Sequence, residues 1–245
     1  MTAPATLQWR QLQPPDLEAM YALHLSSIAG MALQAVKPEK REFLHSLLLG
    51  RGRVLGAWAQ DSLVAYGVLQ HDLLPEDAPR QLLGLAAAAP LCKLAGAAVA
   101  PHWRGHGLQR QLIERRVALA QGASLFATAA PSNPASWHSL LACGLMVRAL
   151  QYRYGGHARY LVAQVAGERF HAATGQAQSL GLDALAQQQA LLERGWRGIA
   201  PGAAPDQLGL VPPAAPGPAP DISPGSSPGP MPGPMPGSMP GQSGE

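Results

Sequence analysis

Residues 97–110 read AAVAPHWRGHGLQR, and this stretch decides the fold. An apolar segment ends at Val99, a turn with two glycines follows, and residues 108–121 show the pattern of an amphipathic helix. The first backbone N–H groups of a helix lack partners within it, and the helix dipole adds partial positive charge there. Gly105 and Gly107 let a ligand approach the backbone closely. The stretch therefore predicts a cradle for a pyrophosphate group.

Two familiar phosphate cradles do not match this turn. A Walker loop requires G-x-x-x-x-G-K-S/T, and no such run occurs in the sequence. A Rossmann fingerprint requires G-x-G-x-x-G, whereas Gly105, Gly107 and Arg110 give G-x-G-x-x-R. A nucleoside triphosphate and a dinucleotide are therefore not the expected ligands.

A third kind of cradle does match. The letters VAP at 99–101 and RGHGL at 104–108 resemble the signature of the GNAT superfamily of acyl-CoA-dependent N-acetyltransferases. There a strand ends in Val-x-Pro and R/Q-x-x-G-x-G/A opens a helix; Gln109 stands here at the last place. The family's second pattern, N-x-x-S/A-x-x-x-Y-x-x-x-G-F, reads Asn133, Ser136, Leu140, Gly144 and Leu145. Both patterns stand in the family's order, and the resemblance covers roughly residues 5–165.

The resemblance implies a fold, a cosubstrate and a reaction. The fold is α/β, with a central mixed β-sheet of about six or seven strands flanked by helices. Acetyl-CoA is the cosubstrate, and its acyl group passes to a primary amine by direct attack. The strand ending at Val99 splays from its neighbour so that its backbone can bind the pantetheine arm. The resemblance places ten residues at acyl-CoA: Val99, Arg104, Gly105, His106, Gly107, Leu108, Gln109, Arg110, Asn133 and Ser136.

The catalytic groups are not identified by the sequence. Leu140 stands where the family usually has a tyrosine acid, and residues 91–100 lack the family's frequent carboxylate base. Candidate substitutes are His138, Tyr152 and Tyr154 as an acid, and His71 and Asp72 acting through water. Two functions therefore stay open: an active N-acyltransferase, and an acetyl-CoA-binding sensor or interaction module that has lost catalysis.

Strand and helix patterns alternate outside the cradle, which independently predicts a mixed sheet with helices on its faces. Apolar and turn patterns place strands at 7–12, 53–60, 62–70, 94–99, 125–128, 145–152 and 160–165. On the helix after Gly107, Arg115 and Arg116 are expected on a solvated face, and Trp137 is expected in the core. Three regions follow: a GNAT-like domain at 1–165, a helical extension packed on it at 166–200 with a helix at 183–194, and a tail at 201–245.

The tail is defined by composition. Residues 201–245 hold 14 of the 24 prolines, and P-G-P/S-M recurs near the end. Proline and glycine oppose both helix and sheet, so this tail is expected to be disordered. A proline-binding partner for it is the functional alternative to a flexible tail without a dedicated partner.

Charge and cysteine content limit the partners. Charged residues make up 13%, the net charge is +3, and no run of five basic residues occurs, so no nucleic-acid partner is expected. Cys92 and Cys143 fit neither zinc spacing nor CxxC, which suggests thiols in a reducing cytosol and no metal site. Residues 82–100 are apolar, but Lys93 and the many small residues argue against a membrane span. We expect a cytoplasmic protein without a secretory signal; a homodimer stays open.

Overall fold

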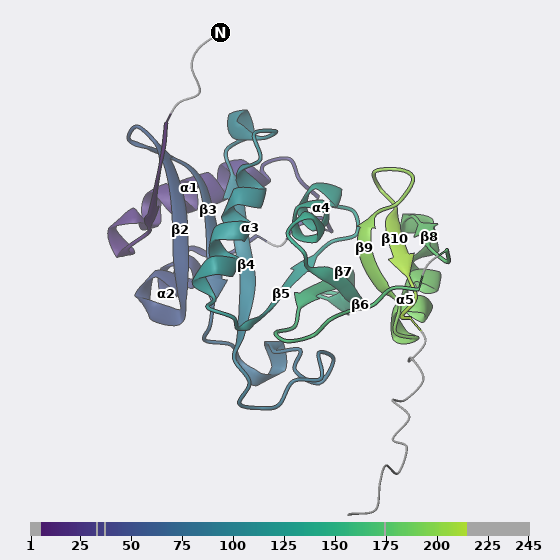
Figure 1. Cartoon of the computed structure of the whole chain (residues 1–245). Coiled ribbons are helices and arrows are strands. Elements are labelled where there is room, and N and C mark those ends of the chain that lie inside the picture. The colour runs from purple at the N-terminus through teal and green to yellow at the C-terminus, as the bar shows by residue number, and fades with distance from the viewer. Residues whose placement is uncertain (1–5, 33, 37, 174, 215–245) are drawn as a thin grey trace, which may run out of the picture. The chain divides into compact units, whose positions relative to one another are not determined.

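The computed structural model describes residues 6–32, 34–36, 38–173 and 175–214 (Figure 1). These residues belong to one compact unit that ends at Ala214. Residues 215–245, which hold most of the predicted tail, lie outside the described residues. None of the described helices combines the length and the apolar composition that a membrane crossing requires.

The described chain forms one mixed β-sheet, in the order β1-β2-β3-β4-β5-β7-β6-β9-β10-β8. Its strands are β1 (Leu7–Gln11), β2 (Gly52–Ala59), β3 (Ser62–Gln70), β4 (Leu91–Val99), β5 (Ser124–Ala129), β6 (Met146–Arg153), β7 (His157–Gln164), β8 (Gln178–Leu180), β9 (Arg197–Pro201) and β10 (Leu208–Val211). Neighbouring strands are antiparallel except β4 and β5, which are parallel. The predicted α/β class is confirmed, with ten strands in place of six or seven.

Helices cover both faces of the sheet. They are α1 (Leu17–Ile28), α2 (Arg41–Ser46), α3 (Leu108–Leu119), α4 (Pro134–Ala142) and α5 (Leu185–Glu193), with 3₁₀ turns at Pro14–Asp16, Pro75–Asp77, Pro101–Trp103 and Leu182–Ala184 and a π turn at Leu47–Arg51. Side chains of α1 and α2 pack on one face around Val68, and those of α3 pack on the other around Ala65. Figure 1 shows α3 and α4 on the near side of the sheet. Trp137 of α4 is fully buried, as predicted.

The region after residue 165 differs from the prediction. Residues 166–200 contain β8 and β9 as well as a helix, and β10 lies within the stretch assigned to the tail. Leu208 and Leu210 of β10 are 0% exposed and join the main core. The tail prediction is therefore wrong for residues 201–214, because an average over 45 residues hides a four-residue apolar strand.

This C-terminal part repeats the α-β-β unit before it. The order α4-β6-β7 is followed by α5-β9-β10, and β9 pairs with β6 at Val147 and Gly198. Each helix is followed, two residues after its end, by a glycine and then by a buried side chain, Leu145 or Trp196. The amide of that residue bonds the carbonyl five residues earlier, at 3.2 Å in the first unit and 3.1 Å in the second. The second unit thereby covers the edge of β6, which would otherwise end the sheet.

The two central strands separate after a short paired segment. Residues Leu91–Lys93 of β4 pair with Ser124–Phe126 of β5, and both strands then continue without pairing to each other. On its other side β4 carries a bulge, because Val68 of β3 lies between the pairs Gly67–Ala97 and Leu69–Leu94 and so faces both Ala95 and Gly96. The predicted splay of the strand that ends at Val99 is present in the structure.

Candidate functional site

Two cavities meet where β4 and β5 separate. A cleft of about 580 Å³ runs between the end of β4, the start of α3 and the side of α4. An inner cavity of about 200 Å³ lies between the separated strands and reaches α1 and α2. They share the lining residues Ile28, Val36, Ala97, Gln109, Asn133 and Ser136. A long ligand in the cleft could therefore present one end to a second molecule in the inner cavity.

The structure brings most of the predicted binding residues to the cleft. Nine of the ten line it: Val99, Arg104, Gly105, Gly107, Leu108, Gln109, Arg110, Asn133 and Ser136. His106 does not, because its Nδ1 lies 2.9 Å from the carbonyl oxygen of Arg104 and 3.3 Å from that of Trp103. The Arg104 guanidinium donates to the Ser27 carbonyl at 2.6 Å, so it fastens the turn to α1. Acyl-CoA binding by these residues stays a prediction.

The turn before α3 needs its glycines for their backbone conformation. Gly105 has φ 80°, and Gly107, the N-cap of α3, has φ 72°. Side chains other than glycine rarely adopt this left-handed region. A Cβ on Gly107 would meet no atom within 4 Å, which places this face of the turn toward open space. Because Gly107, Leu108, Gln109 and Arg110 line the cleft, the first turn of α3, whose N–H groups lack intrahelical partners, forms part of the cleft wall.

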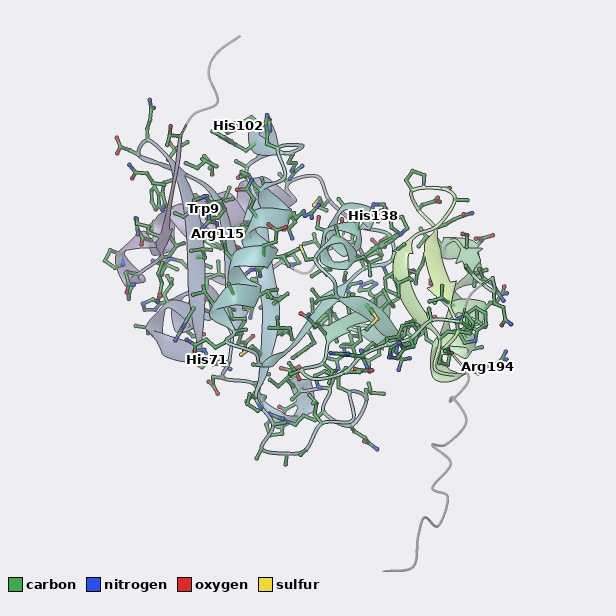
Figure 2. The ribbon with its side chains drawn as sticks, viewed as in Figure 1. Trp9, His71, His102, Arg115, His138 and Arg194 are labelled. Atoms are coloured by element: carbon green, nitrogen blue, oxygen red, sulfur yellow. The ribbon has the colours of Figure 1, made fainter. Side chains whose placement is uncertain are left out.

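Two polar side chains on α4 also line the cleft. Asn133 is the N-cap of α4, yet its side chain makes no capping hydrogen bond, so helix capping does not explain it. Figure 2 shows His138 at α4. Its Nε2 atom is buried and has no hydrogen-bond partner in the described structure, while its ring packs edge-on against Trp137. A buried polar group without a partner costs free energy that a bound ligand can offset. From the sequence, His138 was expected only as a candidate acid.

Of the other proposed catalytic substitutes, Tyr154 alone lines one of these two cavities, the inner one. Tyr152 is 59% exposed and lines neither space. Figure 2 shows His71 at the end of the sheet opposite to His102, which lies in the turn between β4 and α3. Asp72 is paired there with Arg51 at 2.9 Å. The structure therefore does not support water-mediated catalysis by His71 or Asp72.

The inner cavity contains titratable groups from distant segments that the sequence analysis missed. His24 of α1 accepts the backbone N–H of Glu39 at Nε2, at 2.9 Å, and its Nδ1 lies 3.2 Å from the Tyr66 hydroxyl. Because an N–H can only donate, Nε2 carries no proton, and Nδ1 donates to Tyr66. Burial lowers the pKa of His24, which favours this neutral form. His24 thus holds the loop before α2, and Glu39 on this loop lines the cavity.

The prediction that Arg116 lies on a solvated helix face is wrong. Arg116 is 1% exposed and lines the inner cavity, whereas Arg115 is exposed and stacks over Trp9 at 4.3 Å. The guanidinium donates to the carbonyls of Leu112, Val68 and Ala95, at 2.9, 2.9 and 3.4 Å. Val68 and Ala95 lie at the β4 bulge, so Arg116 satisfies carbonyls next to the irregular ladder. Burial lowers its pKa to about 10, which leaves it charged at pH 7.

Gly67 makes room for this arginine, which gives a stability prediction. A Cβ there would lie 2.8 Å from Nε and 2.9 Å from Cζ of Arg116. We expect Gly67→Ala to displace the guanidinium and to lower the free energy of unfolding by about 2–4 kcal/mol in urea titrations. Gly96→Ala, on the facing strand, is the control because its Cβ would meet nothing within 4 Å. Equal stability of the two variants would contradict this role of Arg116.

Sequence comparison finds neither a matching family model nor a similar curated protein. Structure comparison does find neighbours. The acetyltransferase of GNAT family from Streptococcus pneumoniae is 15% identical at a TM-score of 0.52, over 66% of this chain and all of its own. NAA60 from Arabidopsis thaliana, in complex with acetyl-CoA, is 15% identical at 0.53, over 65% of this chain and 99% of its own.

A third neighbour, yncA from Salmonella typhimurium with its cofactor acetyl-CoA, is 16% identical at a TM-score of 0.50, over 69% of this chain and 98% of its own. These likenesses show that the chain has the GNAT fold, as the resemblance in residues 97–110 predicted. A fold alone does not determine activity, so the function must be argued from the two cavities.

Proposed function

We propose that this chain is an acyl-CoA-dependent N-acyltransferase that moves the acetyl group of acetyl-CoA to a primary amine. The observation that carries the proposal is the junction of the two cavities at the separated strands β4 and β5. The cleft offers the start of α3 to a pyrophosphate, and the inner cavity, lined in part by α1 and α2, offers space for a second substrate. Two acetyl-CoA complexes among the neighbours of like fold support the choice of cosubstrate.

The proposed reaction is a direct transfer within this junction. The neutral amine attacks the thioester carbonyl carbon, the C–S bond breaks, and CoA leaves as a thiolate while the amine nitrogen loses a proton. Backbone N–H groups along the unpaired edge of β4 could polarise the carbonyl, with Val99 as the sequence-based candidate. Glu39 lines the inner cavity and would take the amine proton directly or through water. Holding both reactants in one place supplies much of the rate.

One observation favours the alternative, a module that binds acetyl-CoA without turning it over. Leu140 is 4% exposed and lines the inner cavity at the place of the family's tyrosine acid. A leucine cannot protonate the departing thiolate. Thiol release from acetyl-CoA, measured over a panel of amines, separates the two functions: release supports the enzyme, and bound acetyl-CoA without release supports the module.

Ligand binding gives the direct test of the cradle. Acetyl-CoA at 100 times its dissociation constant should add about 2.7 kcal/mol of stability and raise the melting temperature. Gly107→Asp strains the φ of 72° and adds a negative charge at the cleft, so we expect it to abolish this shift. Gly122→Asp is the matched control, because its φ is 82° and it follows the other end of α3. A missing shift in the wild type, or an equal loss in both variants, would contradict the assignment.

A further inference from the structure

The inner cavity has an unbalanced set of charges. Among its described lining residues, Lys93, Arg116 and Arg159 are cationic and Glu39 is acidic. Two of the cations are buried: Arg116 is 1% exposed and Arg159 is 4% exposed. Charged residues are otherwise sparse in this chain, at 13%. A concentration of positive charge around a partly enclosed cavity favours an anion, because the surrounding protein lowers the local dielectric and strengthens the attraction.

Arg159 is the cation best placed to bind that anion. It lies on β7, and its Nη1 donates to the carbonyls of Gln34 at 2.7 Å and Ala158 at 2.8 Å. The hydrogen bond to Gln34 ties the guanidinium to the loop between α1 and α2. Both hydrogen bonds use Nη1, and among the described residues no hydrogen bond of Nε or Nη2 is found, so these atoms can donate to a ligand. A guanidinium binds a carboxylate through two parallel hydrogen bonds, which neutral carbonyls cannot replace.

Arg116 and Lys93 add to the field at the cavity. The hydrogen bonds of Arg116 run to backbone carbonyls, which satisfy its donors without neutralising its charge. Lys93 is the last residue of β4 that pairs with β5, so it lies where the strands begin to separate. Its ammonium is 5.9 Å from the centre of the Phe126 ring. Arg159 would thus bind the anion directly, with two further cations lining the same space.

We propose that the acceptor is a small amine that also carries a carboxylate, as an amino acid does, and that Arg159 binds this carboxylate in the inner cavity. The inference rests on the proposed function, since it describes the second substrate of that reaction. A volume of about 200 Å³ lies below the roughly 300–1,000 Å³ of common ligand sites, so the acceptor is small. Glu39 supplies a carboxylate in the same cavity for the amine end of such a molecule.

The test uses matched acceptors and two readouts. L-amino acids are compared with their carboxamides, with the corresponding decarboxylated amines and with aminoalkyl phosphates of equal length. The first readout is kcat/KM for thiol release from acetyl-CoA. The second is calorimetric binding of each compound to the full chain saturated with CoA, which needs no turnover. For the amino acid that reacts best, we expect kcat/KM and binding affinity to be at least about tenfold higher than for its carboxamide.

Variants assign the preference to a residue. Arg159→Gln should abolish the preference because it weakens binding of the carboxylate compound. The KM of this compound should rise, while the KM and affinity of the carboxamide should change little. Arg159→Lys, which keeps the charge, should retain part of the preference. It also allows the test to be made if Arg159→Gln does not fold. Arg53→Gln is the control, because it removes the same charge from an exposed position of β2 that lines neither cavity. Unfolding curves confirm that each variant is native.

The outcomes separate this inference from the proposed function. If carboxylates bind more tightly than carboxamides but no thiol is released, the proposed enzyme activity is contradicted and the anion site is supported. Thiol release with carboxamides or decarboxylated amines as good as the acids, in both readouts, overturns the anion site and keeps the enzyme. Tighter binding of the aminoalkyl phosphates than of the acids also overturns the carboxylate assignment. A preference that survives Arg159→Gln in folded protein overturns the role of Arg159.

Discussion

Replacing Leu140 with tyrosine is expected to raise the turnover of acetyl transfer by up to about 10²–10⁴-fold, the range of a positioned acid. Leu140 lines the inner cavity together with Asn133 and Ser136 from the same helix. These residues recur at helical spacing, so they share the face of α4 that looks at the junction of the two cavities. A tyrosine there places a phenol where CoA would leave as a thiolate. Turnover should rise, and acetyl-CoA affinity should change little.

Leu140→Phe is the matched control for this experiment. Phenylalanine adds the same ring without a hydroxyl, so it reports the cost of a larger side chain at a position that is 4% exposed. The measurement is kcat for thiol release by the wild type, Leu140→Phe and Leu140→Tyr, with acetyl-CoA binding measured for each. If both aromatic variants change kcat equally, the hydroxyl supplies no proton, and thiolate departure does not limit the wild type.

Truncation after Gly202 is expected to destabilise the folded chain severely. It removes β10, whose Leu208 and Leu210 are both 0% exposed. Burying a leucine contributes about 1.5–3 kcal/mol, so the loss amounts to about 3–6 kcal/mol before hydrogen bonds are counted. The free energy of unfolding of a whole domain is only about 5–15 kcal/mol. Strands β8 and β9 would also lose the strand between them. We expect a large fall in the melting temperature, or a chain that does not fold.

Truncation after Ala214 is the matched control. It keeps β10 and removes only residues 215–245, whose composition of proline, glycine, methionine and serine favours little burial. We expect the melting temperature to stay nearly unchanged. Leu210→Ala in the full chain should lower the free energy of unfolding by about 2–5 kcal/mol, which tests the buried strand without truncation. A chain cut after Gly202 that melts like the one cut after Ala214 would contradict the role of β10.

Local patterns in the sequence predict the wall of the cleft well. The glycine turn before Leu108 and the helix that follows are set by backbone conformation and side-chain periodicity within about a dozen residues. Asn133 and Ser136 were placed at the same site by a second local pattern, and both line the cleft with Gly107. His106 shows the limit of this reasoning. Its position in the motif is right, but its imidazole is engaged by carbonyls of the turn itself.

Arg116 and Leu210 were misjudged because their burial depends on distant segments. An arginine on a helix is usually solvated, and the carbonyls of Val68 and Ala95 that accept its hydrogen bonds come from β3 and β4. The residues around position 116 give no indication of a bulge in another strand. The short apolar run around Leu210 is likewise too brief to stand out from its proline-rich surroundings. It becomes a strand because β8 and β9 offer it hydrogen bonds and the core accepts its leucines.

The sequence by itself predicted the fold, the glycine turn that lines the cleft, and a leucine at position 140 where the resembling family usually has a tyrosine. Each of these depends on one short segment. Only the tertiary structure decided the make-up of the inner cavity. His24, Glu39, Lys93 and Arg159 come from four separate segments, and they meet there because β4 and β5 pair over three residues and then separate. Charge acts through space, so the charge of the inner cavity cannot be predicted along the chain before folding brings these side chains together.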